Sequence, residues 1–245
     1  MKAERITLTP VYLLHQRNWR ETSRLLEVWS REHGRIGLVA RGVRRPSAPQ
    51  RSLLQPFTPL LMSWSQRGEL GNLGAVEGAG VPVLLRGRPL MAAFYMNELL
   101  LRLLPRQDAH PDLYDSYGAT LAALAGPKPA AALRVFETGL LSAIGYGLNL
   151  SQVAPTGAPV EADTDYLYDL DSGPRPAQGR KGPGVPIRGR ALLALRAEAL
   201  DDADDLKAVK RLLAAALERH LEGRALKTSG VMRALARKDR SGEQA

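Results

Sequence analysis

The sequence contains no cysteine among its 245 residues. That absence excludes disulfide bonds, thiol nucleophiles and every cysteine-based zinc site, and it agrees with a reducing compartment. The chain also lacks an apolar run of membrane-spanning length. Its first residues, MKAERITLTP, hold no apolar segment of the signal-peptide kind. We therefore expect a cytoplasmic protein that does not contact a membrane.

Acidic residues are missing from one long stretch of the chain. None lies between Glu32 and Glu69. The net charge of the whole chain is +9, and residues 1–80, with 12 basic and 6 acidic residues, carry +6 of it. The arginines of the acid-free stretch are Arg35, Arg41, Arg44, Arg45, Arg51 and Arg67. Positive charge concentrated in this way indicates a polyanionic partner.

Four of these arginines fall in one short segment, RGVRRPSAPQR, residues 41–51. The segment follows a predicted strand, contains two prolines and has no acid, so it is predicted to be an irregular loop. Like charges repel, and an exposed loop does not need them to fold. Arginine side chains reach phosphates, and their planar groups stack on bases. We therefore predict that this loop contacts nucleic acid.

The first 80 residues predict β structure. Five short segments are rich in β-branched and aromatic residues: ITLTPVYLLH, TSRLLEVWSRE, GRIGLVARGV, QPFTPLLMSWS and ELGNLGAVEG. No helix-length segment separates them, which favours a small closed barrel over a βαβ unit. All three tryptophans lie here, and the core is the expected place for Trp29 and Trp64. Trp19, in the polar stretch HQRNWRE between two predicted strands, is a candidate for base stacking, with a place in the core as the equal alternative.

From residue 81 onward the pattern becomes helical. Apolar residues at steps of three and four predict helices over residues 89–104, 111–124, 129–144, 190–199 and 205–222. Residues 149–189 are rich in proline and glycine, and predict an irregular insertion with one hairpin. A last helix is expected after Thr228–Ser229, and a polar tail over residues 238–245. The prediction is an α+β protein with two domains, residues 1–80 and 81–245.

Two rival functions depend on particular segments. A metal-dependent nuclease would use clustered carboxylates such as DDADD, residues 201–205. These acids directly precede a predicted helix, where they satisfy free N–H groups, so helix capping is favoured. A helix-turn-helix regulator needs a recognition helix, and the run GRALKTSGVMRAL is short for one. Motifs for ATP hydrolysis or a serine nucleophile are missing. We expect neither an enzyme nor a cofactor.

Longer strings in the chain resemble the RecO family of bacterial recombination mediators and DNA-repair proteins. RNWRETSRLLEVWSREHGRIGLVARGVRRPS and LLQPFTPLLMSWSQRGELGNL resemble the N-terminal part of that family. FYMNELLLRLL, FETGLLSAIGYGLNL and LEGRALKTSGVMRAL resemble successive pieces of its helical part. The resemblance runs in the family's order from about Val11 to Leu235. It implies an N-terminal OB-fold barrel followed by a mainly helical domain.

The resemblance also implies a function. RecO-like proteins bind single- and double-stranded DNA and anneal complementary strands without ATP. With RecR, and often RecF, they load RecA on DNA coated by the single-stranded DNA-binding protein, SSB. A cytoplasmic protein at the nucleoid is implied; the alternative is a repair adaptor that binds RecR or SSB and little DNA. The expected DNA contacts are Arg35, Arg41, Arg44, Arg45, Arg51, Trp19 and Arg20.

The SSB tail ends in acidic and apolar residues, so its docking needs apolar surface beside a cation. We expect Arg134 with Leu133 and Phe136 to form this site, with Lys210 or Arg211 as further cations. The alternative is that the apolar residues are simply core. Many RecO-like proteins carry a four-cysteine zinc module after the GYGL segment, whereas SQVAPTGAPVEADTDYLYDLDSG occupies that place here. Metal is therefore not expected, and packing or hydrogen bonds must hold this segment.

Overall fold

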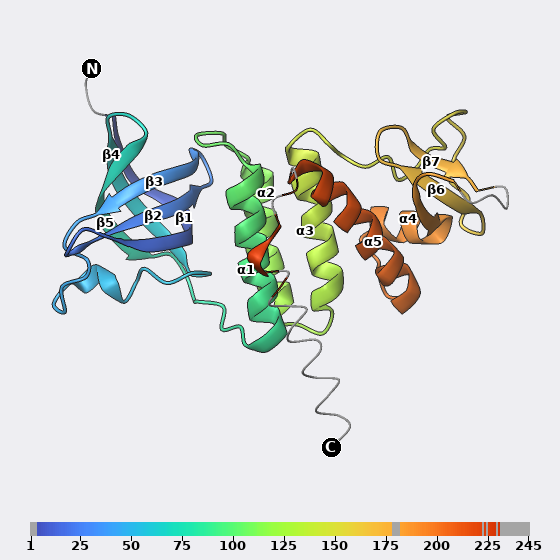
Figure 1. The fold of residues 1–245 in the computed structure, drawn as a ribbon. Helices are drawn as coiled ribbons and strands as arrows, with labels where there is room; N and C mark the ends of the chain where they lie inside the picture. Colours follow the sequence, from blue (N-terminus) through green and yellow to red (C-terminus); the bar gives the residue numbers. More distant parts are fainter. Residues whose placement is uncertain (1–3, 178–181, 222, 224, 229, 231–245) are drawn as a thin grey trace. The chain divides into compact units, whose positions relative to one another are not determined.

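The computed structural model describes residues 4–177, 182–221, 223, 225–228 and 230. The described residues form two compact units, one from residues 4–125 with 226–228 and 230, the other from residues 126–177, 182–221, 223 and 225 (Figure 1). The domain boundary expected at residue 80 stays a prediction, because these units follow packing and not the change from strands to helices. The helix expected after Ser229 and the polar tail over residues 238–245 lie outside the described residues.

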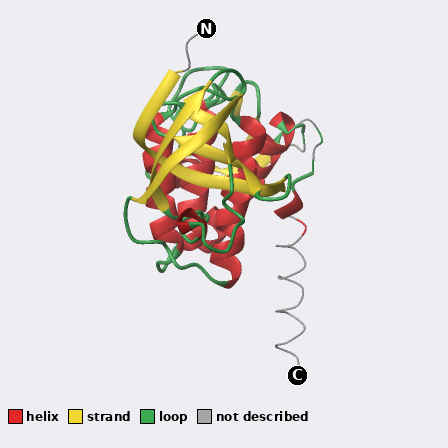
Figure 2. Cartoon of the chain, turned by 90° about the vertical axis from the view of Figure 1, so that its left-hand side faces the viewer, coloured by secondary structure: helices red, strands yellow, loops and turns green. Residues whose placement is uncertain are grey.

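Five strands close into a barrel in the order β1-β2-β3-β5-β4, and Figure 2 shows them crossing one another. They are β1 Glu4–Trp19, β2 Ser23–Ser30, β3 Gly34–Ala40, β4 Pro59–Gln66 and β5 Leu70–Gly78. The parallel pairing of β3 with β5 closes the barrel, while the other neighbours run antiparallel. The predicted five-stranded barrel is confirmed, and its strand order is compatible with an OB-fold.

Apolar side chains from all five strands fill the barrel. The interior includes Val11, Leu13, Leu26, Val28, Ile36, Leu38, Leu60, Met62, Trp64 and Val76. Strand β2 buries both of its faces, because Trp29 packs outside the barrel against α2 (Pro111–Leu124). The Trp29 ring lies 5.4 Å from the Tyr114 ring and 5.6 Å from that of Tyr117. The core positions predicted for Trp29 and Trp64 are therefore confirmed.

Helix α1 (Gly87–Leu103) is joined to the barrel by a buried polar link. Asn97 donates from Nδ2 to the backbone oxygen of Leu14 at 2.9 Å. The same amide accepts a hydrogen bond from the Tyr117 hydroxyl at 2.6 Å. A buried amide needs such partners, since an unsatisfied polar group costs about 1–3 kcal/mol. One asparagine thus fixes α1, α2 and β1 together.

Residues that follow the second unit return to α1. The Glu98 carboxylate accepts hydrogen bonds from the backbone N–H groups of Lys227 and Thr228 at 3.0 and 2.9 Å. It also accepts from the Thr228 hydroxyl at 2.8 Å. A carboxylate that receives backbone N–H groups acts as a helix cap does. Glu98 therefore anchors the returning chain.

The second unit combines helices with a small sheet. Its helices are α3 Pro129–Ala143, α4 Gly189–Arg196 and α5 Ala203–His220, and its strands are β6 Asp165–Asp169, β7 Gly173–Pro176 and β8 Val185–Arg188. The sheet order is β7-β6-β8. The expectation of one hairpin in an irregular insertion was therefore incomplete. Strand β8 was missed because it is four residues long and contains a proline, which donates no backbone hydrogen bond and in a sequence argues against a strand.

Aromatic packing and turn hydrogen bonds hold this sheet. Tyr166 and Tyr168 on β6 are buried, and the Tyr166 hydroxyl accepts the Glu161 N–H at 3.0 Å. Asp169 accepts two backbone N–H groups of the turn after β6, at 2.9 and 3.0 Å. Such side-chain-to-backbone bonds fix a tight turn. These contacts provide the packing and hydrogen bonds that were expected in place of cysteine ligands.

Helix α5 begins at the acidic cluster that raised the nuclease alternative. Asp202 accepts the backbone N–H groups of Asp204 and Asp205, at 3.0 and 2.9 Å, so capping is confirmed. Arg190 pairs with Asp202 at 3.0 Å and with Asp205 at 2.9 Å. Within the described ranges, no three His, Asp or Glu side chains gather as metal ligands do. No described helix has the length and hydropathy needed to span a membrane.

Candidate nucleic-acid interface

The basic loop, residues 41–52, leaves the barrel between β3 and β4. Gly42 has a φ of +70°, in the left-handed region that glycine adopts without strain. Two residues later, the Arg44 N–H donates to the carbonyl of Thr22 at 3.0 Å. Thr22 belongs to the turn between β1 and β2, so the basic loop turns back along the end of this hairpin. The 3₁₀ helix Pro49–Arg51 lies near its far end.

The side chain of Arg44 fastens the loop to the same turn. Its Nη1 donates to the carbonyl oxygens of Arg20 at 3.1 Å and of Glu21 at 2.8 Å. Arg44 is half-buried. The sequence placed it among the DNA contacts, whereas the structure places its guanidinium on backbone oxygens. Its first role is therefore to position the loop that carries the other arginines.

The chain just after the basic loop is held through Gln16, which is itself held by Arg24, a residue that the sequence prediction omitted. Gln16 on β1 donates to the carbonyl of Leu54 at 3.2 Å, and Arg24 on β2 donates to Gln16 Oε1 at 2.8 Å. Arg24 lies opposite Asn18 in the β1–β2 ladder. The signal that could have identified it is its alternation with buried Ser23 and Leu25, which turns it outward.

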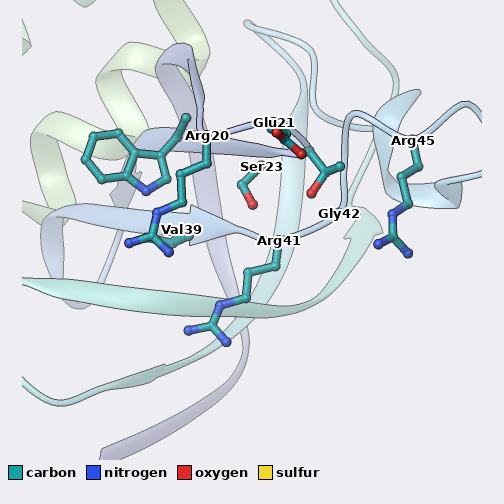
Figure 3. Close-up of a pocket in the computed structure, with 9 residues that line it drawn as sticks. Arg20, Glu21, Ser23, Val39, Arg41, Gly42 and Arg45 are labelled. Carbon is teal, nitrogen blue, oxygen red and sulfur yellow. The ribbon is translucent and has the colours of Figure 1, made fainter.

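Four expected contacts meet in one depression of about 800 Å³, which we call the first hollow. They are Trp19 and Arg20 from the β1–β2 hairpin, and Arg41 and Arg45 from the basic loop. All four are exposed. In Figure 3 the side chains of Arg20, Arg41 and Arg45 extend in the same general direction from the backbone that carries them. Glu21 also lines this space, so three cations against one carboxylate leave an excess of positive charge that suits a bound polyanion.

Trp19 is the last residue of β1, because the ladder continues through its pairing with Ser23. The expected position in a stretch between strands was therefore wrong, although the side chain is 36% exposed. The Arg17 guanidinium lies 5.7 Å from the centre of the indole ring, a cation–π distance. An exposed indole flanked by cations has the chemistry that stacks on an unpaired base.

A second depression, of about 580 Å³, adjoins the later part of the basic loop. Its lining includes Arg51, which was expected as a DNA contact, and Arg24, which was not. The other lining residues are Pro46, Ser47, Ala48, Pro49, Ser52 and Gln55. None of them is acidic or aromatic. We call this depression the second hollow.

Arg35 lines neither hollow, and the DNA contact expected of it stays a prediction. Its Nη1 donates to the carbonyl oxygens of Leu100, at 3.4 Å, and Leu101. These are carbonyls of the last turn of α1, where a cation is stabilised by the helix dipole. Burial lowers the pKa of Arg35, and Glu27 opposes that shift. Arg35 therefore joins β3 to α1.

The residues expected to hold the SSB tail are also placed differently. Leu133 and Phe136 on α3 are buried, and Arg134, 7% exposed, pairs with Glu137 at 2.9 Å. Arg134 is therefore largely enclosed in the folded unit, and its assignment to the SSB tail stays a prediction. Lys210 and Arg211 on α5 are exposed, and Arg211 donates to a β8 carbonyl at 3.3 Å.

Comparison with known proteins gives one consistent result. Residues 1–81 match the family model described as recombination protein O N terminal, and residues 86–230 match the C-terminal model. The DNA repair protein RecO of Methylococcus capsulatus is 46% identical over 230 residues, 94% of each chain. The RecO protein of Nitrosococcus oceani is 45% identical over 234 residues, 95% of each chain. The RecO protein of Alkalilimnicola ehrlichii is 44% identical over 243 residues, 98% of this chain and 96% of its own. At this identity over nearly the full length, the chain belongs to the RecO family of DNA repair proteins.

Proposed function

We propose that the protein is a mediator of DNA repair and recombination that binds single- and double-stranded DNA and anneals complementary strands without ATP. The observation that supports this proposal is the first hollow. There Arg20, Arg41 and Arg45 surround one space beside the exposed ring of Trp19. Cations that reach phosphates, next to an aromatic that stacks on bases, are the two elements of single-strand binding on small barrels.

An annealing protein must reduce the repulsion between two polyanions without holding either of them tightly. Arginine–phosphate contacts have this property, because their strength comes largely from counterion release and falls as salt rises. Base pairing then supplies the free energy of the reaction. No nucleotide hydrolysis is required, and the positive charge of the basic loop is used for DNA at some cost in self-repulsion.

The proposal includes the family's partners: loading of RecA on SSB-coated DNA together with RecR, and often RecF. For the SSB tail we propose the exposed cations Lys210 and Arg211 as contacts. A peptide reaches both without opening a helix, whereas Arg134 is enclosed. The positive charges of Lys210 and Arg211 on α5 attract the acidic residues of the tail.

The experiment that tests the proposal is annealing of complementary fluorescent oligonucleotides without ATP, across a salt series. The variant is Arg41→Ala/Arg45→Ala. The control Arg67→Ala/Arg86→Ala removes the same charge from two exposed positions that line neither hollow. We expect annealing to slow in the variant alone. We also expect its salt slope for single-strand binding to decrease by about one per arginine removed.

Two results would contradict the proposal. If the variant and its control anneal equally, the first hollow is not the DNA site. If the wild-type protein neither binds nor anneals DNA but binds RecR or the SSB tail, the adaptor alternative replaces the proposal.

A further inference from the structure

The two hollows are lined by consecutive parts of the same loop. Residues 41–45 contribute to the first hollow and residues 46–52 to the second. Hydrogen bonds from Arg44 to the Glu21 carbonyl and from Gln16 to the Leu54 carbonyl fix the loop at both ends. The basic loop is therefore held in place and lines both hollows. Each hollow has arginines that the other lacks.

The chemistry of the two linings differs. The first hollow contains an exposed indole, that of Trp19, and stacking on an indole requires a base that is free of its partner. The second hollow has no aromatic side chain, and its polar groups are two guanidiniums, two hydroxyls and one amide. Such groups bind phosphate oxygens, which single strands and duplexes both present.

We propose that the hollows bind different strands: the first holds an unpaired strand by its bases and phosphates, and the second holds only the phosphate backbone of the strand that pairs with it. The inference rests on the proposed function and deepens it. Because the second hollow contacts no base, the strand held there keeps its base edges free for pairing. The same contacts persist when the duplex has formed.

The size of each depression agrees with this division. Volumes of about 800 and 580 Å³ lie within the range of about 300–1,000 Å³ that small-molecule sites occupy. The first therefore has room for a nucleotide, and the second for the sugar–phosphate backbone of one strand. A duplex keeps the phosphate contacts of the second hollow, and its paired bases stay outside.

The test compares Trp19→Ala with Arg51→Ala, one for each hollow. Arg51 is chosen because it is exposed, whereas Arg24 also supports Gln16. The matched control is Arg67→Ala. Anisotropy gives the Kd for a labelled single strand and for a labelled blunt duplex, and a stopped-flow assay gives the annealing rate. Circular dichroism confirms that each variant is folded.

Trp19→Ala is expected to weaken single-strand binding about ten-fold, since base stacking is worth about 1–3 kcal/mol per base, and to leave duplex binding within about two-fold. Arg51→Ala is expected to leave single-strand binding within about two-fold, but to weaken duplex binding and slow annealing about five-fold, as loss of one charged contact does. Arg51→Lys should restore most of both, because a phosphate accepts either cation.

Three outcomes would contradict either the two-strand inference or the proposed function. Equal loss of single-strand binding in both variants means one continuous site, and the inference fails while the proposed function stands. Unchanged duplex binding and annealing in Arg51→Ala also overturns the inference. If the wild-type protein binds no DNA, the proposed function itself fails.

Discussion

Arg44 donates from Nη1 to the backbone carbonyl of Glu21 at 2.8 Å, and this contact fixes the basic loop against the β1–β2 turn. Its sequence neighbour Arg45 is exposed and lines the first hollow. Adjacent arginines of the same charge therefore have separable tasks, one in holding the loop and one in facing the hollow.

We expect Arg44→Ala to lower the free energy of unfolding by about 1–2 kcal/mol, because the hydrogen bonds of its guanidinium are lost. Arg45→Ala should stay within about 0.5 kcal/mol of the wild type, as exposed substitutions usually do. Urea denaturation measures both. The assignment is contradicted if the two variants have the same stability.

Trp19 provides an intrinsic probe, because the other two tryptophans of the chain, Trp29 and Trp64, are 0% and 2% exposed. We expect a single-stranded oligonucleotide to quench the exposed indole by stacking on it. Fluorescence titration should show this quenching in the wild type and lose it in Trp19→Phe, which keeps an aromatic ring for binding. Quenching that survives in Trp19→Phe would mean that DNA acts on the buried tryptophans from a distance.

The ion pair between Arg134 and Glu137 predicts a stability effect in α3. Removing one partner of a buried pair takes a compensating charge away from the other, so Arg134→Ala should destabilise the protein by about 3–5 kcal/mol. Arg211→Ala, at an exposed position on α5, is the control, with an expected change below about 0.5 kcal/mol. Thermal and urea unfolding measure the difference. An Arg134→Ala protein of wild-type stability that no longer binds the SSB tail would restore the assignment made from sequence.

Glu98 predicts a dependence of stability on pH. Burial opposes its ionisation, but hydrogen bonds from Thr228 and Lys227, with Arg102 nearby, outweigh burial and hold its pKa below the ordinary value. A lowered folded-state pKa contributes stability above the unfolded value of about 4.3, and this contribution is lost as pH falls through the folded-state pKa.

Glu98→Gln should therefore be less stable than the wild type near pH 7, by about 1–3 kcal/mol. The difference should be smaller near pH 3, because protonation of Glu98 removes this contribution as pH falls through the lowered folded-state pKa. Chemical denaturation at the two pH values gives the comparison. The control Glu77→Gln, at an exposed position on β5, should show no difference at either pH. A gap for Glu98→Gln that is equally large at low pH would show that its charge is not what anchors residues 227 and 228.

The barrel strands and the helices followed from local pattern, because alternation and apolar stripes reflect burial directly, whereas the short strand β8 did not. The positions of arginines did not. Arg35, Arg45 and Arg134 look alike in sequence, yet the structure places them on a helix end, in an exposed hollow and in a buried ion pair. Which of these an arginine adopts depends on partners far along the chain, such as the carbonyl of Leu100 for Arg35. Arg24 was missed although alternation turns it outward, because its link to the basic loop runs through Gln16 to Leu54, a connection that the sequence does not reveal.

The hydrogen bonds to Glu98 also bear on the order in which parts of the chain fold during synthesis. Its hydrogen-bond donors lie 129 and 130 residues further along. All residues that line the two hollows precede residue 56, so a ribosome has produced the complete lining while Glu98 still lacks its partners. Domains generally fold during synthesis in the order in which they emerge. The barrel face is thus complete early, and the unit that contains it closes only after the whole intervening unit has left the ribosome.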